Sequence, residues 1–414
     1  LAYASQGATM DAGSSINVSE VMTTADMIVG SKETTRLYAG SLIGQGNIVA
    51  ATNFASTGRI VPITGYSDDP TNNHFYVGGF VGQANSVQIA NAYSLTSIIA
   101  DSIDYQAIQA LNINALFGDI TDDKNISTEY VYYSSDYALF TEESGAGYNL
   151  SAYTLTRSNI WRTNSENGLN YRGGFWAEIE SASGSYYLPY ITSLSTQMIN
   201  YGILKEDNKT FSYQLNALTP TIIDDSTGNN ILVSDESSDE FKYYILSNNL
   251  TNLTFTGGGV LNGILIGGES EYTQFTSQTS GEYSGIIPKV GRHSAISNLH
   301  IRLSAETEYT IGNNDISGII AGLNEGVIFN SSIQGTGVTI NSGNMGLVSG
   351  RNSGLISYSY STLEVVELTA NALAGITYQN QGMILSCYFT GYINNITAIG
   401  EDGEITDSIP AASI

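Results

Sequence analysis

The sequence is short of cysteine, proline and long apolar runs, and each shortage excludes a class of structure. Among 414 residues there are only 6 prolines and a single cysteine, Cys387, so no disulfide can form within the chain. No histidine or basic residue stands near Cys387, and we interpret it as a small apolar side chain in the core. No apolar run reaches the roughly 18 residues of a membrane-spanning helix, and none is expected.

Positive charge is also scarce. The chain has 14 Lys and Arg against 39 Asp and Glu, which gives a formal net charge of −25. Such a chain repels nucleic acid and anionic membranes, so neither is expected as a partner. The acidity has two interpretations, namely solubility, or divalent-cation binding and a saline or acidic habitat.

Motifs that carry chemistry are missing. The sequence has no GxSxG, HExxH or P-loop pattern, and its histidines (His74, His293 and His300) do not have the spacing of metal ligands. The acidic stretches DDSTGNN at 224–230 and Asp122–Asp123 lack the alternating ligands of an EF-hand loop and are interpreted as loops, with weak Ca²⁺ binding as the alternative. We therefore predict no catalytic, cofactor-binding or metal residues, and no enzyme.

What the sequence does contain is a repeated frame. It runs as Gly, two apolar residues, a polar turn with Gly or Asn, and then Ile, often followed by Asn two positions later and Tyr four positions later. The turn glycines Gly326, Gly354 and Gly382 are 28 residues apart. The isoleucines of the frame are Ile89, Ile296, Ile328, Ile356, Ile384 and Ile405.

The frame predicts strands that stack in register. Side chains alternate along a strand, so stacked repeats would form an aliphatic column of the isoleucines and a polar and an aromatic column beside it. The polar column is expected to be a buried ladder of Asn91, Asn298 and Asn330, which makes Asn330 a poor glycosylation acceptor despite its Asn-x-Ser context. The aromatic column holds Tyr93, Tyr360 and Tyr388, with His300 at the same position. Positive φ is the expected reason for the turn glycines.

These residues carry a resemblance to a known family. The stretch GLVSGRNSGLISYSY at 346–360 resembles the GLUG repeat of microbial cell-surface proteins, approximately Gly-Leu-Val-Gly-x-Asn-x-Gly-x-Ile-x-Asn-[Cys/Ser]-Tyr-x-x-Gly. The segment FWAEIESASGSYYLPYI at 175–191 is similar to the end of a block of such repeats. The resemblance implies an all-β protein, a right-handed parallel β-solenoid (β-helix) on the cell surface, as in adhesins. It does not imply a catalytic activity.

The regularity of the repeats suggests three parts. Residues 1–198 hold looser repeats and the Trp- and Tyr-rich closing segment. Residues 199–284 form an acidic connecting segment and a strand pair at 249–268, and residues 285–414 hold the regular repeats. A short helix is expected within 102–116. Leu1 is interpreted as a trimmed mature end or as the start of a fragment, which fits an extracellular or cell-surface location.

Three functions are compatible with these features. The first is a structural protein that self-associates through its solenoid ends into a surface filament or layer, as a homopolymer. The second is an adhesin stalk or binding module that presents tyrosines such as Tyr130, Tyr132 and Tyr133 to glycans or to other cells. The third is a polysaccharide-active β-helix enzyme or phage spike. No cofactor is expected beyond the weak Ca²⁺ alternative.

Overall fold

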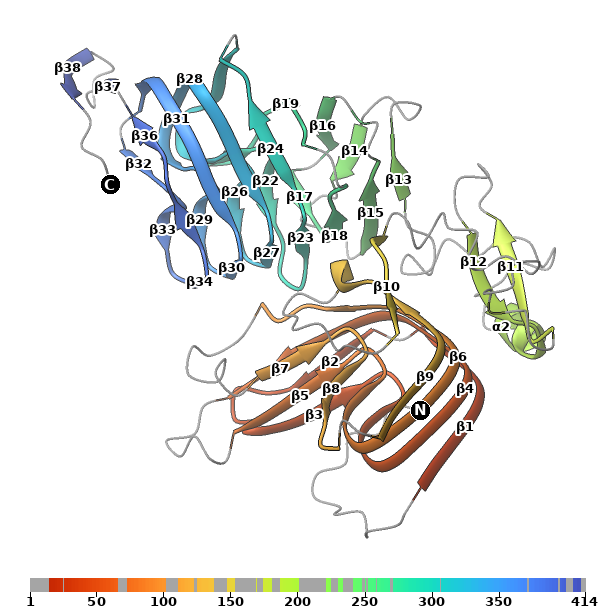
Figure 1. The fold of residues 1–414 in the computed structure, drawn as a ribbon. Helices are drawn as coiled ribbons and strands as arrows, with labels where there is room; N and C mark the ends of the chain where they lie inside the picture. The colour runs from red at the N-terminus through yellow and green to blue at the C-terminus, as the bar shows by residue number, and fades with distance from the viewer. Residues whose placement is uncertain are drawn as a thin grey trace. The chain divides into compact units, whose positions relative to one another are not determined.

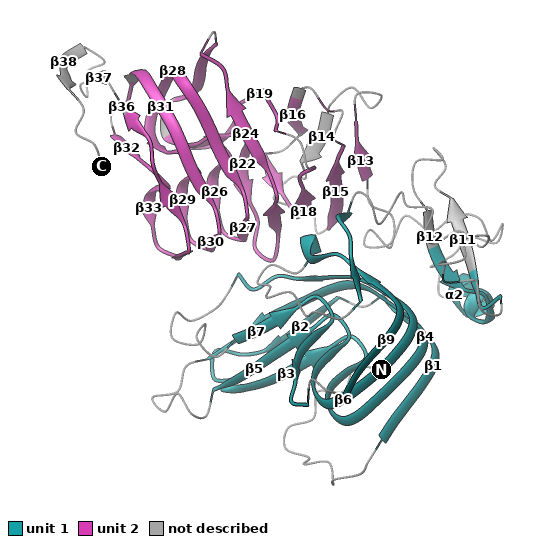
Figure 2. Cartoon of the chain, in the orientation of Figure 1, with its two compact units in different colours: residues 1–220 teal, residues 221–414 magenta. Residues whose placement is uncertain are grey.

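The computed structural model describes most of the chain. The described residues are 15–24, 26–65, 73–101, 111–122, 125–137, 147–152, 169, 174–180, 187–200, 221–224, 230–233, 241–247, 250, 252–257, 259–268, 271–305, 307–370, 372–393, 395–399 and 405–410. The chain divides into two compact units, residues 1–220 and residues 221–414 (Figure 2). Both units consist mainly of β-strands (Figure 1). Within the described residues, no helix has the length and apolar character needed to cross a membrane.

The first unit contains two parallel sheets and an antiparallel hairpin. The larger sheet has the order β1 (Ser15–Thr23), β4 (Ile43–Ile63), β6 (Val81–Ile98), β9 (Ile126–Tyr133), β10 (Tyr148–Asn149), with β2 (Met27–Gly30) beside β4 and β8 (Phe117–Ile120) beside β6. The smaller sheet has the order β3 (Arg36–Gly40), β5 (His74–Gly78), β7 (Leu111–Asn114). The hairpin pairs β11 (Trp176–Glu180) with β12 (Tyr187–Ile191), and the short helices are η4 (Ser135–Tyr137), η7 (Thr192–Leu194) and α2 (Ser195–Asn200).

The second unit contains three parallel sheets built from successive repeats and a fourth, mostly parallel sheet. One has the order β13 (Thr221–Ile223), β15 (Lys242–Leu246), β18 (Gly263–Ile266), β23 (Ala295–Ser297), β27 (Val327–Phe329), β30 (Leu355–Ser357), β34 (Met383–Leu385). The next has the order β17 (Val260–Leu261), β22 (Ile287–Val290), β26 (Ala321–Asn324), β29 (Ser349–Asn352), β33 (Thr377–Asn380). A three-stranded sheet has the order β14 (Asn230–Val233), β16 (Asn252–Gly257), β19 (Gln274–Thr276).

The largest sheet of the second unit has the longest strands. Its order is β20 (Gln278–Ser280), β21 (Tyr283–Gly285), β25 (Glu308–Gly318), β28 (Ser332–Gly346), β31 (Tyr360–Thr369), β37 (Asn395–Ile399), β38 (Ile405–Pro410). Further strands pair with β28 and β31 along the same sheet, namely β24 (His300–Leu303), β32 (Ala372–Ala374), β35 (Tyr388–Phe389) and β36 (Tyr392–Ile393). All pairings in the second unit are parallel except β20 with β21 and β37 with β38, within the described residues.

The aliphatic column is confirmed in the second unit. Ile296 pairs with Ile328, Ile328 with Ile356, and Ile356 with Ile384, each one repeat further along the sequence. Ile296, Ile328 and Ile356 are fully buried in the apolar core. Ile405 does not continue the column, because β38 turns back and pairs antiparallel with β37.

The predicted position of the asparagines is wrong. Asn298 and Asn330 have φ values of 56° and 44°, and Tyr358 and Ser386 follow at the same place in later repeats with 49° and 52°. These residues form a corner column, at which the chain bends from one sheet into the next in the left-handed conformation. In the first unit Glu20, Asn53, Asn91 and Tyr130 form a corner column with the same left-handed backbone, and there it lies within the strands of a single sheet. Asn330 is exposed, so the expected poor access for glycosylation is also wrong.

The reason given for the turn glycines also needs correction. Gly326, Gly354 and Gly382 are not among the residues with positive φ. A Cβ on Gly354 would lie 2.1 Å from the carbonyl oxygen of Gly326, and a Cβ on Gly382 would lie 2.1 Å from that of Gly354. These positions therefore require glycine because consecutive repeats approach each other closely at the backbone.

Two further segments differ from expectation. The expected helix within 102–116 is replaced at its end by β7, which begins at Leu111, while 102–110 lie outside the described residues. The closing segment forms the hairpin of β11 and β12, which contacts Tyr93. The Tyr93 hydroxyl donates a hydrogen bond of 2.7 Å to the Pro189 carbonyl, and its ring lies 5.8 Å from that of Trp176.

Candidate functional site

A ladder of side-chain amides joins β26, β29 and β33 of the second unit, at residues that the sequence did not single out. The Nδ2 atom of Asn324 donates to Oδ1 of Asn352 at 2.8 Å, and Nδ2 of Asn352 donates to Oδ1 of Asn380 at 2.8 Å. Asn324 and Asn352 also donate to the carbonyls of Leu355 and Met383. The signal was present in the frame, because each of these asparagines stands two positions before a turn glycine. The ladder reaches the surface at Asn380, which is exposed.

A second column of polar and aromatic side chains runs across β24, β28, β31 and β35. His300 pairs in register with Ser332, Ser332 with Tyr360, and Tyr360 with Tyr388. This confirms that His300 occupies the column of the repeat tyrosines. Ser332 is fully buried, His300 and Tyr360 are half-buried, and Tyr388 is 50% exposed.

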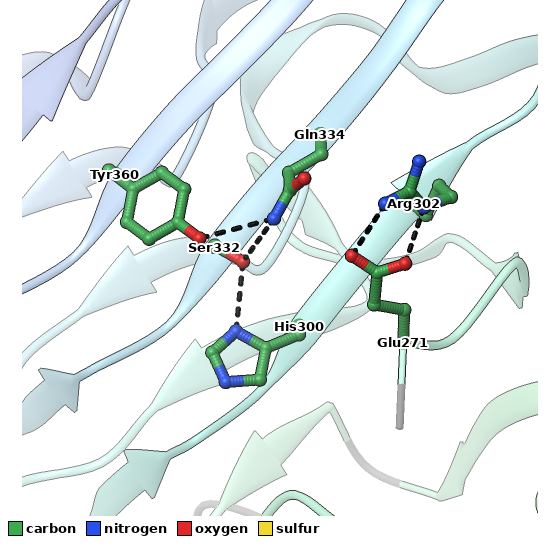
Figure 3. A network of polar contacts seen from close by, with 6 residues as sticks. All are labelled: Glu271, His300, Arg302, Ser332, Gln334 and Tyr360. Atoms are coloured by element: carbon green, nitrogen blue, oxygen red, sulfur yellow. Dashed lines mark hydrogen bonds and ion pairs between the residues drawn. The ribbon is translucent and has the colours of Figure 1, made fainter. Parts of the chain in front are cut away.

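The column belongs to a network of hydrogen bonds (Figure 3). Nδ1 of His300 lies 2.8 Å from the Ser332 hydroxyl, and Nε2 of Gln334 donates to the Tyr360 hydroxyl at 3.1 Å. On the same sheet, the Arg302 guanidinium makes a two-pronged contact with the Glu271 carboxylate, one arm of it at 2.8 Å (Figure 3). That contact lowers the pKa of Glu271.

The His300–Ser332 pair has the residue types of a catalytic base and its nucleophile, but a substrate has no access to it. Ser332 is fully buried, so a substrate cannot reach its hydroxyl. Burial lowers the pKa of His300, with the Glu271 charge acting in the opposite direction. The Glu271 carboxylate is bound to Arg302 and does not orient the imidazole. The pair therefore serves to satisfy polar groups across the strands.

In three sheets of the second unit, the strands that follow β29, β30 and β31 are partly exposed. We call the free edges of β33, β34 and β35 the open end; each of these strands has one neighbour among the described residues. Figure 1 labels β33 and β34. No side chain within 372–392 is fully buried. Ile384 is 36% exposed, whereas Ile356, its counterpart one repeat earlier, is fully buried.

Three columns stop at the open end. The ring of Tyr388 stacks on that of Tyr360 with centroids 4.8 Å apart and an interplanar angle of 2°, which covers one face of Tyr388. The amide ladder ends at Asn380, whose Nδ2 donates back to the Gly382 carbonyl at 3.2 Å. The aliphatic column ends at Ile384. Cys387 is half-buried here, its thiol donates to the Leu385 carbonyl, and burial raises its pKa.

The other residues considered from the sequence lie elsewhere. Tyr132 and Tyr133 are buried in the first unit, and burial raises the pKa of Tyr132 to about 12, so neither ring is available to stack on a sugar. Asp122 accepts a hydrogen bond from Asn125, while Asp123 and 225–229 lie outside the described residues. Over the part of the chain that is described, no three His, Cys, Asp or Glu side chains gather as metal ligands would.

The open end thus leaves apolar side chains, strand edges and an aromatic face exposed together. Comparison with known proteins adds no family to this picture, because the chain matches no family model, no curated protein and no solved structure.

Proposed function

We propose that the chain is an extracellular structural protein, a right-handed parallel β-solenoid of GLUG-like repeats that builds a cell-surface filament or layer through contacts between solenoid ends. The observation that carries the proposal is the open end. A strand edge with unpaired backbone groups and half-buried apolar side chains favours pairing with another strand. Solenoid proteins that stay monomeric normally cover such ends with a polar cap.

The geometry of the open end favours continuation by a similar strand over binding of a small ligand. Its columns repeat in register, and the aliphatic and aromatic columns end in side chains whose next partners would be one strand further on. Ile384 offers an apolar contact and Tyr388 offers an uncovered ring face. One added strand would cover both Ile384 and the ring of Tyr388, because neighbouring strands are about 4.8 Å apart.

The alternative function, a glycan-binding adhesin module, finds one supporting observation. Tyr358, Tyr388 and Tyr392 are 46%, 50% and 43% exposed and belong to neighbouring strands and bends of the second unit. Exposed tyrosines can stack on sugar rings. If this function is correct, Tyr392→Ala lowers binding on a glycan array while the protein remains monomeric.

The test of the proposed function is to place a charge at the open end. Ile384→Lys is expected to abolish filaments in negative-stain images and to leave only the monomer in sedimentation velocity, because a lysine on a strand edge opposes pairing. Since Ile384 is partly exposed, the β circular dichroism spectrum and melting temperature should change little.

The matched control is Thr336→Lys, which makes the same charge change at an exposed position of β28 away from the open end. It should assemble like the parent chain. A parent chain that stays monomeric at high concentration, with and without Ca²⁺, would refute the proposed function.

A further inference from the structure

We infer that the partner of the open end is the free edge of β1 in a second copy of this chain, in a register that places Val21 of that copy beside Cys387. The inference rests on the proposed function, since it names the surface that completes the end-to-end contact. It is carried by a match between the two corner columns, one in each unit.

Like several other strands that stand at the end of their sheets, β1 has one free edge in the described part of the chain. Among the described residues, β1 pairs only with β4, in parallel, from Ser15 to Thr23. Val18 and Val21 pack against the apolar core of the first unit but are only half-buried. The corner residue Glu20 lies between them, and its carboxylate accepts a hydrogen bond from Ser193. The side chain of Glu20 is thus held by its own copy, near the point where β12 contacts β1, and no described strand pairs with the outer backbone edge of β1.

The corner columns define one frame for both ends. In the first unit the residues two before and one after the corner are Val18 and Val21, with Glu20 at φ 57°. At the open end the corresponding residues are Ile384 and Cys387, with Ser386 at φ 52°. In both units, the residue one after the corner packs against the core, as Val21 and Cys387 do. Each end therefore presents apolar side chains at the same steps from the same backbone bend.

Superposing the corners fixes the register between the two copies. If β1 continues the sheet beyond β34 in the same parallel sense, Ile384 lies beside Val18, Cys387 beside Val21 and Tyr388 beside Met22. The ring face of Tyr388 that Tyr360 leaves uncovered would then rest on the flexible Met22 side chain, a favourable sulfur–aromatic contact. The residues that would face β33 in this register precede Ser15 and lie outside the described residues.

The contact is heterologous, because one edge of the chain meets a different edge of its neighbour. Such contacts propagate as a filament or close as a ring, and they cannot stop at a two-fold dimer. Each copy carries the same negative net charge, so the two copies repel each other at low salt. The apolar columns and the strand pairing must therefore supply the attraction.

The native Cys387 makes the register testable with one substitution. Paired residues on neighbouring strands have Cα atoms about 5 Å apart, which suits a disulfide. Val21→Cys, assembled and then treated with a mild oxidant at alkaline pH to ionise the half-buried thiol, should give a ladder of dimers, trimers and longer species on a non-reducing gel. The ladder should collapse to the monomer on reduction. Val21→Cys with Cys387→Ser should give no ladder.

Thr23→Cys is the control for the register, since Thr23 is two residues further along β1 and would meet Cys387 only after a slip. Assembly is measured separately by sedimentation. Three outcomes for a Val21→Cys chain that assembles would refute the register and leave the proposed function standing. They are the absence of a ladder, a disulfide formed within one monomer, and weaker crosslinking than in Thr23→Cys. If neither the parent nor the variants assemble, the proposed function itself has failed.

Discussion

At the scale of single residues, the corner columns determine where the chain bends, between sheets in the second unit and within the long strands in the first. A left-handed backbone is readily adopted by Gly and tolerated by Asn, but it costs other residues about 1–2 kcal/mol. Asn53, Asn91, Asn298 and Asn330 suit the position, whereas Tyr358 does not. At Asn330 the side chain also donates to Oδ1 of Asn298 at 2.7 Å, so an asparagine gains a side-chain partner there as well.

The corner predicts an order of stability at Tyr358. Tyr358→Asn should be more stable than Tyr358→Ala by about 1 kcal/mol in urea unfolding, because both lose the aromatic ring but only asparagine tolerates the bend. Comparing the two variants removes the contribution of the edge-on contact between Tyr358 and Phe329. Equal stabilities would show that the left-handed backbone carries no penalty in this repeat.

His300 predicts a dependence of stability on pH. Burial lowers its pKa in the folded chain, so below the ordinary value of about 6.5 the unfolded chain takes up the proton first. The free energy of unfolding should therefore fall as pH drops from about 7.5 toward the lowered pKa of the folded state, and level off below it. His300→Asn should lack this component. Because many carboxylates titrate in the same experiment, the measured quantity is the difference between parent and variant, and a difference that is constant with pH would contradict the prediction.

At the scale of elements, close stacking of the repeats explains the glycines. Gly354 lies where its Cβ would meet the Gly326 carbonyl, so the requirement is for space. Overpacking of this kind costs about 1–3 kcal/mol or more. Gly354→Ala and Gly354→Asn should both destabilise the second unit by at least that amount in thermal or urea unfolding.

The asparagine variant separates the two explanations for Gly354. If positive φ were the reason for glycine, asparagine would be tolerated better than alanine. Gly281→Ala serves as the opposite control, because φ is +62° there and no atom lies within 4 Å of the added Cβ. It should cost only the backbone strain, and Gly281→Asn should recover most of that loss.

At the scale of the whole molecule, charge limits association. Copies with a formal net charge of −25 repel each other, and this repulsion is screened over about 10 Å at 0.1 M salt. The proposed assembly should therefore strengthen as NaCl rises from low concentration, as followed by light scattering. CaCl₂ at equal ionic strength should have the same effect if Ca²⁺ acts only by screening. A clearly stronger effect of CaCl₂ would instead indicate the weak Ca²⁺ binding considered from the acidic stretches.

The sequence by itself determined the strands and the aliphatic column. Ile328, Ile356 and Ile384 recur at a fixed step with the alternation of a half-buried strand, and local pattern is sufficient to place such residues in register. The same pattern located His300 and the tyrosine column across the sheet.

Only the tertiary structure decided which side of the bend each polar residue occupies. A continuous strand through Ile356, Tyr358 and Tyr360 would keep all three on one face, but the left-handed backbone at Tyr358 turns the chain into the next sheet. The same left-handed bend at Asn330 leaves its side chain exposed. The fold instead buries the amide ladder of Asn324 and Asn352. The physical reason is that the bend, the close approach at Gly354 and the uncovered edge of β34 depend on neighbouring repeats, which local sequence pattern does not describe.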